Sequence, residues 1–289
     1  MRKAHKKNRA VGAPQIKENK YMNKSVKQQQ LERKILKLLS GKALKTAEML
    51  FADPEIQALQ EYANIVSIKR LGFNDHGPVH MRTAALNAIL MFKLLNEAGI
   101  QMNLEKEKVG TADDSLMAVI MASIMHDMGM SVARDSHEFV SIQLAIPFID
   151  KILAATHKED EYHIKAAIKC IAVEGIFGHM ATHTIHSLEA GLVLIGDGSD
   201  MEKGRARIPA MLSTKARIGD IHRTSAGAIQ KVRIMKGEEK PIRIEVEMNA
   251  SVGFFQVEEV FFPKIKISPV KPFIELYAGV TDRDMLKYL

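Results

Sequence analysis

The chain has 289 residues, of which 46% are hydrophobic and 26% charged, a balance typical of globular proteins and unlike that of intrinsically disordered chains. No run reaches the roughly 18 apolar residues of a membrane-spanning helix, and the basic start of the chain lacks the apolar core of a secretory signal. The single cysteine, Cys170, excludes a disulfide framework, so we expect a cytoplasmic protein that does not enter a membrane.

The positive charge of the chain is concentrated at its start. Residues 1–30 hold nine Lys or Arg and one acidic residue, a net charge of +8, whereas the remaining residues sum to −1. Such a segment cannot bury enough apolar surface to offset its ordering entropy, so we predict a basic, disordered tail. The tail could bind RNA or another acidic partner, or it could only keep the chain in solution; both interpretations stay open.

The apolar residues of the region 31–228 recur with the period of α-helices. We expect helices over about 28–70, 79–98, 116–127, 137–155, 161–172, 188–201 and 215–228. The segments 116–127 and 188–201 are apolar nearly all round, so these two helices should be central and buried. Asp113 to Ser115 is the predicted cap of the first of them.

The period changes in the last part of the chain. Residues 242–248 alternate strictly between apolar and polar, which is the pattern of a half-buried strand. The segments 254–262, 264–267 and 273–277 resemble strand or mixed material, with prolines between them. We therefore predict a mainly α protein in which a small α+β module with two or three strands, residues 232–289, follows the helical domain. Its strands could pair edge to edge in a homo-oligomer.

Candidate metal ligands are concentrated in the predicted helical domain. Ten of the eleven histidines lie between residues 76 and 222. His126 and Asp127 end one apolar helix, and Asp197 follows an apolar run in another. A single histidine on an apolar helix is more often a hydrogen-bonded core residue than a ligand. Several buried ionisable groups together are costly unless they have partners, and a divalent metal would compensate all of them.

Three motifs, taken in order, resemble the HD superfamily of metal-dependent phosphohydrolases over roughly residues 70–225. They are His80 at the head of an apolar helix, the pair His126-Asp127 followed by Gly129, and Asp197 at the end of the run from Leu194. The resemblance implies an HD-domain helical bundle. It also implies one metal whose ligands match His80, His126, Asp127 and Asp197.

Some members of this superfamily hold a second metal with two further histidines. His137 and His179 match these in order and context, with Asp127 bridging the two metals. Otherwise His137 and His179 would line the pocket or act as an acid. His183 and His186 could exchange roles with His179, or they could belong only to a surface loop.

The chain departs from the family pattern at two places. Met130 stands where many members have Lys or His, and Gly196-Asp197-Gly198 stands where many have Ala-Asp; neither change removes a ligand. Asp200 is expected to orient a ligand, as carboxylates beside metal sites usually do. His157 and His163 lie in a polar stretch and are expected at the surface, and His76 competes with His80 as a ligand.

The implied ligands are imidazoles and carboxylates, which suit Mn²⁺, Fe²⁺, Ni²⁺, Co²⁺ or Zn²⁺. The resemblance therefore implies a phosphohydrolase in which a metal-activated hydroxide attacks a phosphoester or phosphoanhydride, with Asp127, His137 and His179 as catalytic residues. The expected substrate is a phosphorylated small molecule of the nucleotide type. Candidate residues for binding its phosphate are Lys203, Arg205, Arg207, Arg82 and Arg134.

Two other functions remain open at this point. The metal could only stabilise a regulatory protein that binds RNA or protein with little turnover, although the complete ligand set favours an enzyme. The same ligands could also hold the di-iron centre of an oxygenase. The basic run from Lys203 to Arg207 could be no more than a solvated turn.

Overall fold

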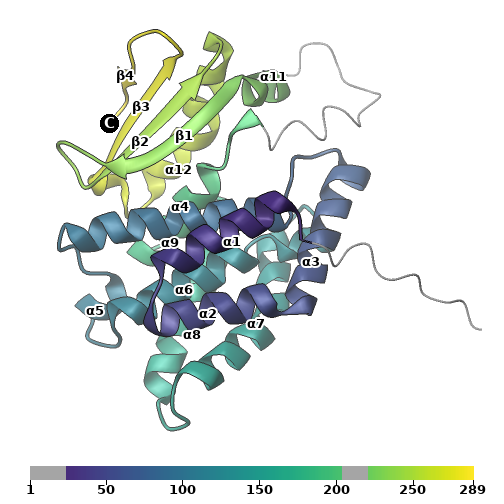
Figure 1. Ribbon diagram of the computed structural model, residues 1–289, viewed down its shortest axis with the longest axis vertical. Helices are drawn as coiled ribbons and strands as arrows, with labels where there is room; N and C mark the ends of the chain where they lie inside the picture. Colours follow the sequence, from purple (N-terminus) through teal and green to yellow (C-terminus); the bar gives the residue numbers. More distant parts are fainter. Residues whose placement is uncertain (1–23, 204–220) are drawn as a thin grey trace, which may run out of the picture.

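The computed structural model describes residues 24–203 and 221–289, which form a helical domain with a small sheet against one side (Figure 1). The helices are α1 (Val26–Leu38), α2 (Gly41–Ala52), α3 (Pro54–Ile65), η1 (Val66–Leu71), α4 (Pro78–Glu97), α5 (Asn103–Lys106), α6 (Ala112–Met125), η2 (Met128–Ser131), α7 (His137–Thr156), α8 (Tyr162–Gly178), α9 (Leu188–Gly198), α11 (Ile221–Ala228), η3 (Ser251–Gly253), η4 (Gln256–Phe261), α12 (Phe262–Ile267) and η5 (Lys271–Phe273). The strands are β1 (Ile229–Lys236), β2 (Ile242–Met248), β3 (Ile274–Val280) and β4 (Leu286–Lys287). The predicted class, mainly α with a small C-terminal β-containing module, is confirmed.

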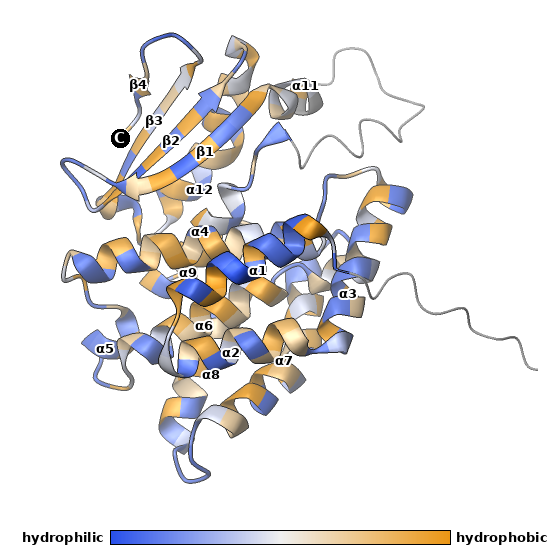
Figure 2. Ribbon diagram, viewed as in Figure 1, coloured by the Kyte–Doolittle hydropathy of each residue, from blue (hydrophilic) through white to orange (hydrophobic). Residues whose placement is uncertain are grey.

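The centre of the helical domain is built from α4, α6 and α9, which pack against one another. Nearly every residue of α6 from Asp114 onward is buried, and so is α9 from Glu189 to Asp197. Figure 2 shows the contrast between these mostly hydrophobic helices and the more hydrophilic α1 and α5 at the outside. The two helices predicted to be central are therefore central, and the candidate ligands lie at their ends.

The helical domain begins before the predicted boundary at residue 30. The Ser25 hydroxyl accepts a hydrogen bond from the Gln28 amide at 3.1 Å, and this cap starts α1 at Val26. Gln28 is itself buried. The predicted tail therefore includes the first turn of a helix, and its residues 1–23 lie outside the described part of the chain.

Helix α6 is capped differently from the prediction. Its N-cap is Thr111, whose hydroxyl accepts from the Asp114 amide at 3.3 Å while the Asp114 carboxylate accepts from the Thr111 amide at 2.9 Å. Asp113 instead accepts from the amides of Lys42 at 2.8 Å and Ala43 at 3.2 Å, at the start of α2. The assignment of Asp113 to Ser115 as the cap was therefore wrong, because Asp113 serves another helix.

The C-terminal module is a four-stranded sheet in the order β1-β2-β3-β4. β1 and β2 are antiparallel, β2 and β3 are parallel, and β3 and β4 are antiparallel. The strand predicted over 242–248 is confirmed as β2. The segments 254–262 and 264–267 are helical instead, because two parallel strands need a crossover and η4 with α12 provides it.

The module packs directly on the helix that carries Asp197. Figure 1 shows α12 between the sheet and the helices α4 and α9. A Cβ atom on Gly198 of α9 would lie only 2.9 Å from Lys264 Cδ and 3.1 Å from Phe261 Cδ2. Two elements that meet this closely leave no room for a side chain, so glycine permits the contact.

Helix α7 is the one helix of the described residues that is long and apolar enough to span a membrane by length and composition. A single such helix is weak evidence, because helices of a folded domain meet the same criteria. Its buried residues, such as Phe148 and Ile152, face α2, α8 and η2, while Asp150 and Lys151 lie on its exposed face. This amphipathic pattern is typical of a helix at the side of a domain.

Candidate metal centre

Six of the predicted site residues come together in the centre of the helical domain. They come from five places: the first turn of α4, the end of α6, the start of α7, the end of α8 and the end of α9. All are buried, and they are His80, His126, Asp127, His137, His179 and Asp197.

These residues form two groups that share Asp127. His80, His126 and Asp127 make one group, and Asp127, His137 and His179 make the other. Oδ2 of Asp127 lies 3.3 Å from Nε2 of both His80 and His126. Oδ1 lies 3.0 Å from Nε2 of His137 and 3.3 Å from Nε2 of His179. The two oxygens of one carboxylate thus face opposite halves of the centre, so Asp127 belongs to both groups.

Asp197 completes the first half of the centre. Its Oδ1 lies 3.1 Å from His80 Nε2 and 3.7 Å from His126 Nε2. Its other oxygen, Oδ2, turns away and accepts from Lys264. The first half therefore offers four protein ligand atoms, and the second half offers three.

The histidine rings are oriented so that their Nε2 atoms face inward. In each ring Nδ1 contacts an oxygen that can only accept, so the neutral form of the ring carries its proton on Nδ1 and its lone pair on Nε2. The acceptors are Asp200 Oδ2 for His80 at 2.7 Å, Ser123 O for His126 at 2.9 Å, Arg134 O for His137 at 2.8 Å and Ile176 O for His179 at 2.6 Å. The contact between Asp200 and Nδ1 of His80 is the one that the predicted orienting role of Asp200 requires.

The inward-facing nitrogens approach each other closely. Nε2 of His80 lies 3.2 Å from Nε2 of His126, and Nε2 of His137 lies 3.0 Å from Nε2 of His179. Two lone pairs at such distances repel unless a proton or a metal ion lies between them. Buried imidazoles and carboxylates that converge in this way fit a borderline divalent metal well.

The buried carboxylates of the centre also need a positive charge beside them. Burial would raise the pKa of Asp197, but Lys264, His126 and His80 hold it well below its usual range. Burial would lower the pKa of His126, but Asp127 and Asp197 raise it to about 9. Without a metal, a proton on His126 therefore compensates the carboxylates. Burial lowers the pKa of His179 to about 4, which leaves this ring neutral and able to act as a ligand.

Arg134 lies beside the second half of the centre. Its guanidinium is 5.5 Å above the ring centroid of Phe73, and Nη1 lies 3.9 Å from the sulfur atoms of Met130 and Met180. Among the described residues no carboxylate contacts it. A half-buried guanidinium without an anionic partner is a reasonable phosphate ligand.

Arg82 contradicts its predicted role in phosphate binding. It is fully buried, and its Nε donates to Glu32 at 2.7 Å while Nη1 donates to Gln60 at 2.6 Å. Arg82 follows His80 by two residues, which places the two side chains about 200° apart around α4. The guanidinium therefore faces α1 and α3, away from the centre.

The other predicted phosphate ligands lie farther along the chain. Lys203 is exposed and donates to Gln230 Oε1 at 2.6 Å. Arg205 and Arg207 lie outside the described residues.

Further histidines lie outside the two groups of candidate ligands. His157, expected at the surface, is buried with Nε2 3.0 Å from Asp114 Oδ1, so that expectation was wrong. His163 is exposed as expected. His76 packs edge-on against His80, with ring centroids 5.8 Å apart, and His183 stacks on Phe177.

Lys264 reaches the centre from the C-terminal module, and no sequence pattern pointed to it. Its Nζ donates to Asp197 Oδ2 at 2.5 Å and to the carbonyl oxygen of His179 at 2.9 Å. The residue lies 67 positions after Asp197, on a helix predicted as strand or mixed material. Only the packing of α12 against α9 brings it there.

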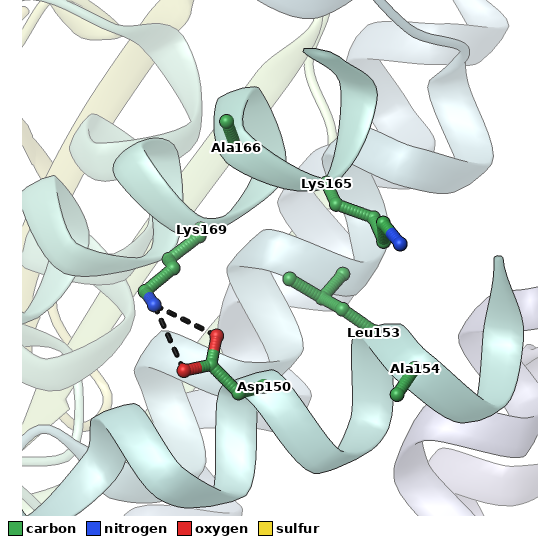
Figure 3. A pocket seen from close by; sticks show the side chains of 6 residues that line it. All are labelled: Asp150, Leu153, Ala154, Lys165, Ala166 and Lys169. Atoms are coloured by element: carbon green, nitrogen blue, oxygen red, sulfur yellow. Dashed lines mark hydrogen bonds and ion pairs between the residues drawn. The ribbon is translucent and has the colours of Figure 1, made fainter. Parts of the chain in front are cut away.

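A separate pocket lies between α7 and α8 (Figure 3). Lys169 donates there to both carboxylate oxygens of Asp150, at 2.7 Å and 2.9 Å. Asp150 is thirteen residues after His137, or about 20 Å along the helix, so this pocket is not part of the centre.

Comparison with known proteins finds a relative that matches most of the chain. The chain is 37% identical over 232 residues to the uncharacterized protein MJ1020 of Methanocaldococcus jannaschii, which covers 80% of this chain and 86% of that protein. No family model matches the chain, and no solved structure matches it.

Proposed function

The chain belongs to the same family as the uncharacterized protein MJ1020, and we propose that it is a metal-dependent phosphohydrolase of the HD type. The observation that carries this proposal is the pair of converging histidine couples that share the Asp127 carboxylate. The proposed reaction is hydrolysis of a phosphoester or phosphoanhydride in a nucleotide-like substrate.

The residues have distinct roles in the proposed centre. His80, His126, Asp127 and Asp197 would hold one divalent metal, and Asp127, His137 and His179 would hold a second. A divalent metal supplies a water whose pKa is lowered to about 7 and neutralises charge on a phosphoryl oxygen. The half with three protein ligands leaves coordination positions open, as catalytic sites do.

The remaining polar groups orient ligands and substrate. Asp200 and the carbonyl oxygens of Ser123, Arg134 and Ile176 fix the four imidazole rings. The main chain of Arg134 is thereby anchored next to His137 while its guanidinium remains available for a phosphate oxygen. Burial of the whole centre excludes bulk water, which strengthens each electrostatic contact with a substrate anion.

The first test measures metal content and hydrolysis together. Wild-type protein purified without chelator should contain one or two transition-metal equivalents per chain. With that metal it should hydrolyse members of a panel of nucleotides, p-nitrophenyl phosphate and bis(p-nitrophenyl) phosphate. Asp127→Asn should lose metal in both halves and lower kcat by at least about 100-fold, because the bridging carboxylate is lost.

The matched control is Asp150→Asn, which removes an aspartate charge in the separate pocket and should leave both readouts unchanged. Wild-type protein that binds metal but hydrolyses no substrate of the panel would overturn the proposal. In that case a metal-stabilised regulatory protein becomes the better interpretation.

A further inference from the structure

Lys264 brings a positive charge from the C-terminal module into the metal centre. It contacts one residue from each half: the carboxylate of Asp197 in the first and the main-chain carbonyl oxygen of His179 in the second. Its contact with Asp197 uses Oδ2, the oxygen that faces away from the histidines, so the lysine does not replace a metal ligand atom.

The ammonium of Lys264 has donor capacity left for a ligand. It carries three N–H groups, and within the described chain Asp197 and His179 accept from two of them. Its side chain is 14% exposed, compared with 8% for Asp197 and 2% for Asp127. The Lys264 side chain is therefore more exposed than either of these carboxylates, and it offers a fixed cation to an incoming anion.

The surface of α9 leaves room for the side chain of Lys264 to reach the centre. A Cβ atom on Gly198 would lie 2.9 Å from Cδ of Lys264, so the glycine lets the lysine stem pass alongside the helix. Gly198 is one of the two glycines at which the chain departs from the HD pattern. The departure has a physical reason here: the residue after Asp197 must leave space for Lys264.

From these contacts we propose that Lys264 binds the phosphoryl group of the substrate at the metal centre. The proposal rests on the phosphohydrolase function above and adds a substrate-binding residue from the C-terminal module. A phosphoryl group bound across the two halves would accept the remaining N–H of Lys264. Ammonium-to-phosphate hydrogen bonds are among the strong, charge-assisted kind. Met130, which follows the ligand pair His126-Asp127, offers no charge for this purpose.

The test uses inorganic phosphate as the probe, so it does not depend on turnover. Full-length protein is loaded with Co²⁺, and phosphate is titrated while the visible absorption of the cobalt is followed. The variants are Lys264→Met, Lys264→Gln and Lys264→Arg. Gln keeps a hydrogen-bond donor for Asp197 but removes the charge. Lys271→Met is the control, because it removes a charge from an exposed lysine of the same module.

The expected result separates charge from positioning. Lys264→Met and Lys264→Gln should keep the cobalt content of the wild type but need at least about tenfold more phosphate for half-saturation. Lys264→Arg should restore most of the affinity, and Lys271→Met should match the wild type. With a hydrolysed substrate, the same two variants should raise KM more than they lower kcat.

Three outcomes would overturn the inference. Phosphate affinity equal to that of the wild type in Lys264→Gln would show that the charge does not bind phosphate. Loss of cobalt in Lys264→Gln would show that the lysine only holds Asp197 in place. A wild-type cobalt spectrum that does not respond to phosphate would show that the centre does not bind this anion. A wild type that binds phosphate but hydrolyses nothing would instead overturn the proposed function and leave the anion site intact.

Discussion

At the scale of single residues, the centre depends on which nitrogen of each histidine carries a proton. Three of the four rings donate from Nδ1 to the carbonyl of the third residue before them, which a chain leaving or entering a helix can present. His80 is the exception, because its Nδ1 contacts the carboxylate of Asp200, 120 residues later in the chain. Only this ring is therefore held by a side chain that can be replaced without changing a ligand.

Replacing Asp200 should weaken the first half of the centre selectively. Asp200→Ala leaves His80 free to rotate and removes a carboxylate that raises its basicity, so metal affinity there should fall by about 10–100-fold. In Asp200→Asn the metal affinity should fall less, because the amide oxygen of asparagine can still accept a hydrogen bond from Nδ1 of His80. Competitive titration with a chromophoric chelator would measure both sites. Equal weakening of both halves would contradict the assignment of Asp200 to His80.

At the scale of elements, the first half of the centre requires α4 and α9 to approach closely. A Cβ atom on Gly196 would lie 2.6 Å from the carbonyl oxygen of Ala84 and 3.0 Å from Cβ of Ala88. This contact brings His80 and Asp197 within reach of each other, since the two residues lie on these helices.

Gly196→Ala should therefore separate α4 from α9. We expect the free energy of unfolding to fall by about 1–3 kcal/mol, because an added methyl group meets backbone in a packed core. We also expect a lower metal affinity in the first half. Urea unfolding would measure the first effect and metal titration the second. Gly227→Ala is the matched control, because nothing lies within 4 Å of the added Cβ atom in α11, and it should not destabilise the protein.

Local patterns predicted much of this architecture and missed what depends on distant packing. The apolar periods of α4 and α7 placed these helices within a few residues, and the alternation over 242–248 placed β2. The six candidate ligands come together because their motifs sit at helix ends that the domain brings to one centre. Arg82 and His157 were misassigned because each pairs with a residue far along the chain, Glu32 and Asp114. Lys264 was missed for the same reason.

At the scale of the whole molecule, the centre brings together helices of the helical domain and one helix of the C-terminal module. Its candidate ligands come from α4, α6, α7, α8 and α9 or the residues directly after them, and Lys264 adds α12. A ligand that binds only the folded state stabilises that state according to its concentration and affinity. Metal at the centre should therefore stabilise the helical domain and the module together.

Removing the metal should lower the thermal stability of the entire chain. A metal at 1,000 times its dissociation constant contributes about 4 kcal/mol, so chelation by EDTA should lower Tm by several degrees. Re-addition of Mn²⁺, Co²⁺ or Ni²⁺ should restore Tm. Asp127→Asn should show no such response, and differential scanning calorimetry would measure all of these changes. A wild-type Tm that is indifferent to EDTA and to added metal would contradict the structural role of the centre.

The distance along the chain between partners in the centre has a consequence for biosynthesis. His80 meets Asp200 across 120 residues, and Asp197 meets Lys264 across 67. A nascent chain on the ribosome has therefore made His80 and the pair His126-Asp127 long before their last partners emerge. Contacts this far apart in sequence form late, because the intervening chain must close first. A metal ion should therefore be selected only after the chain has been completed and folded, from the ions that the cell then keeps available.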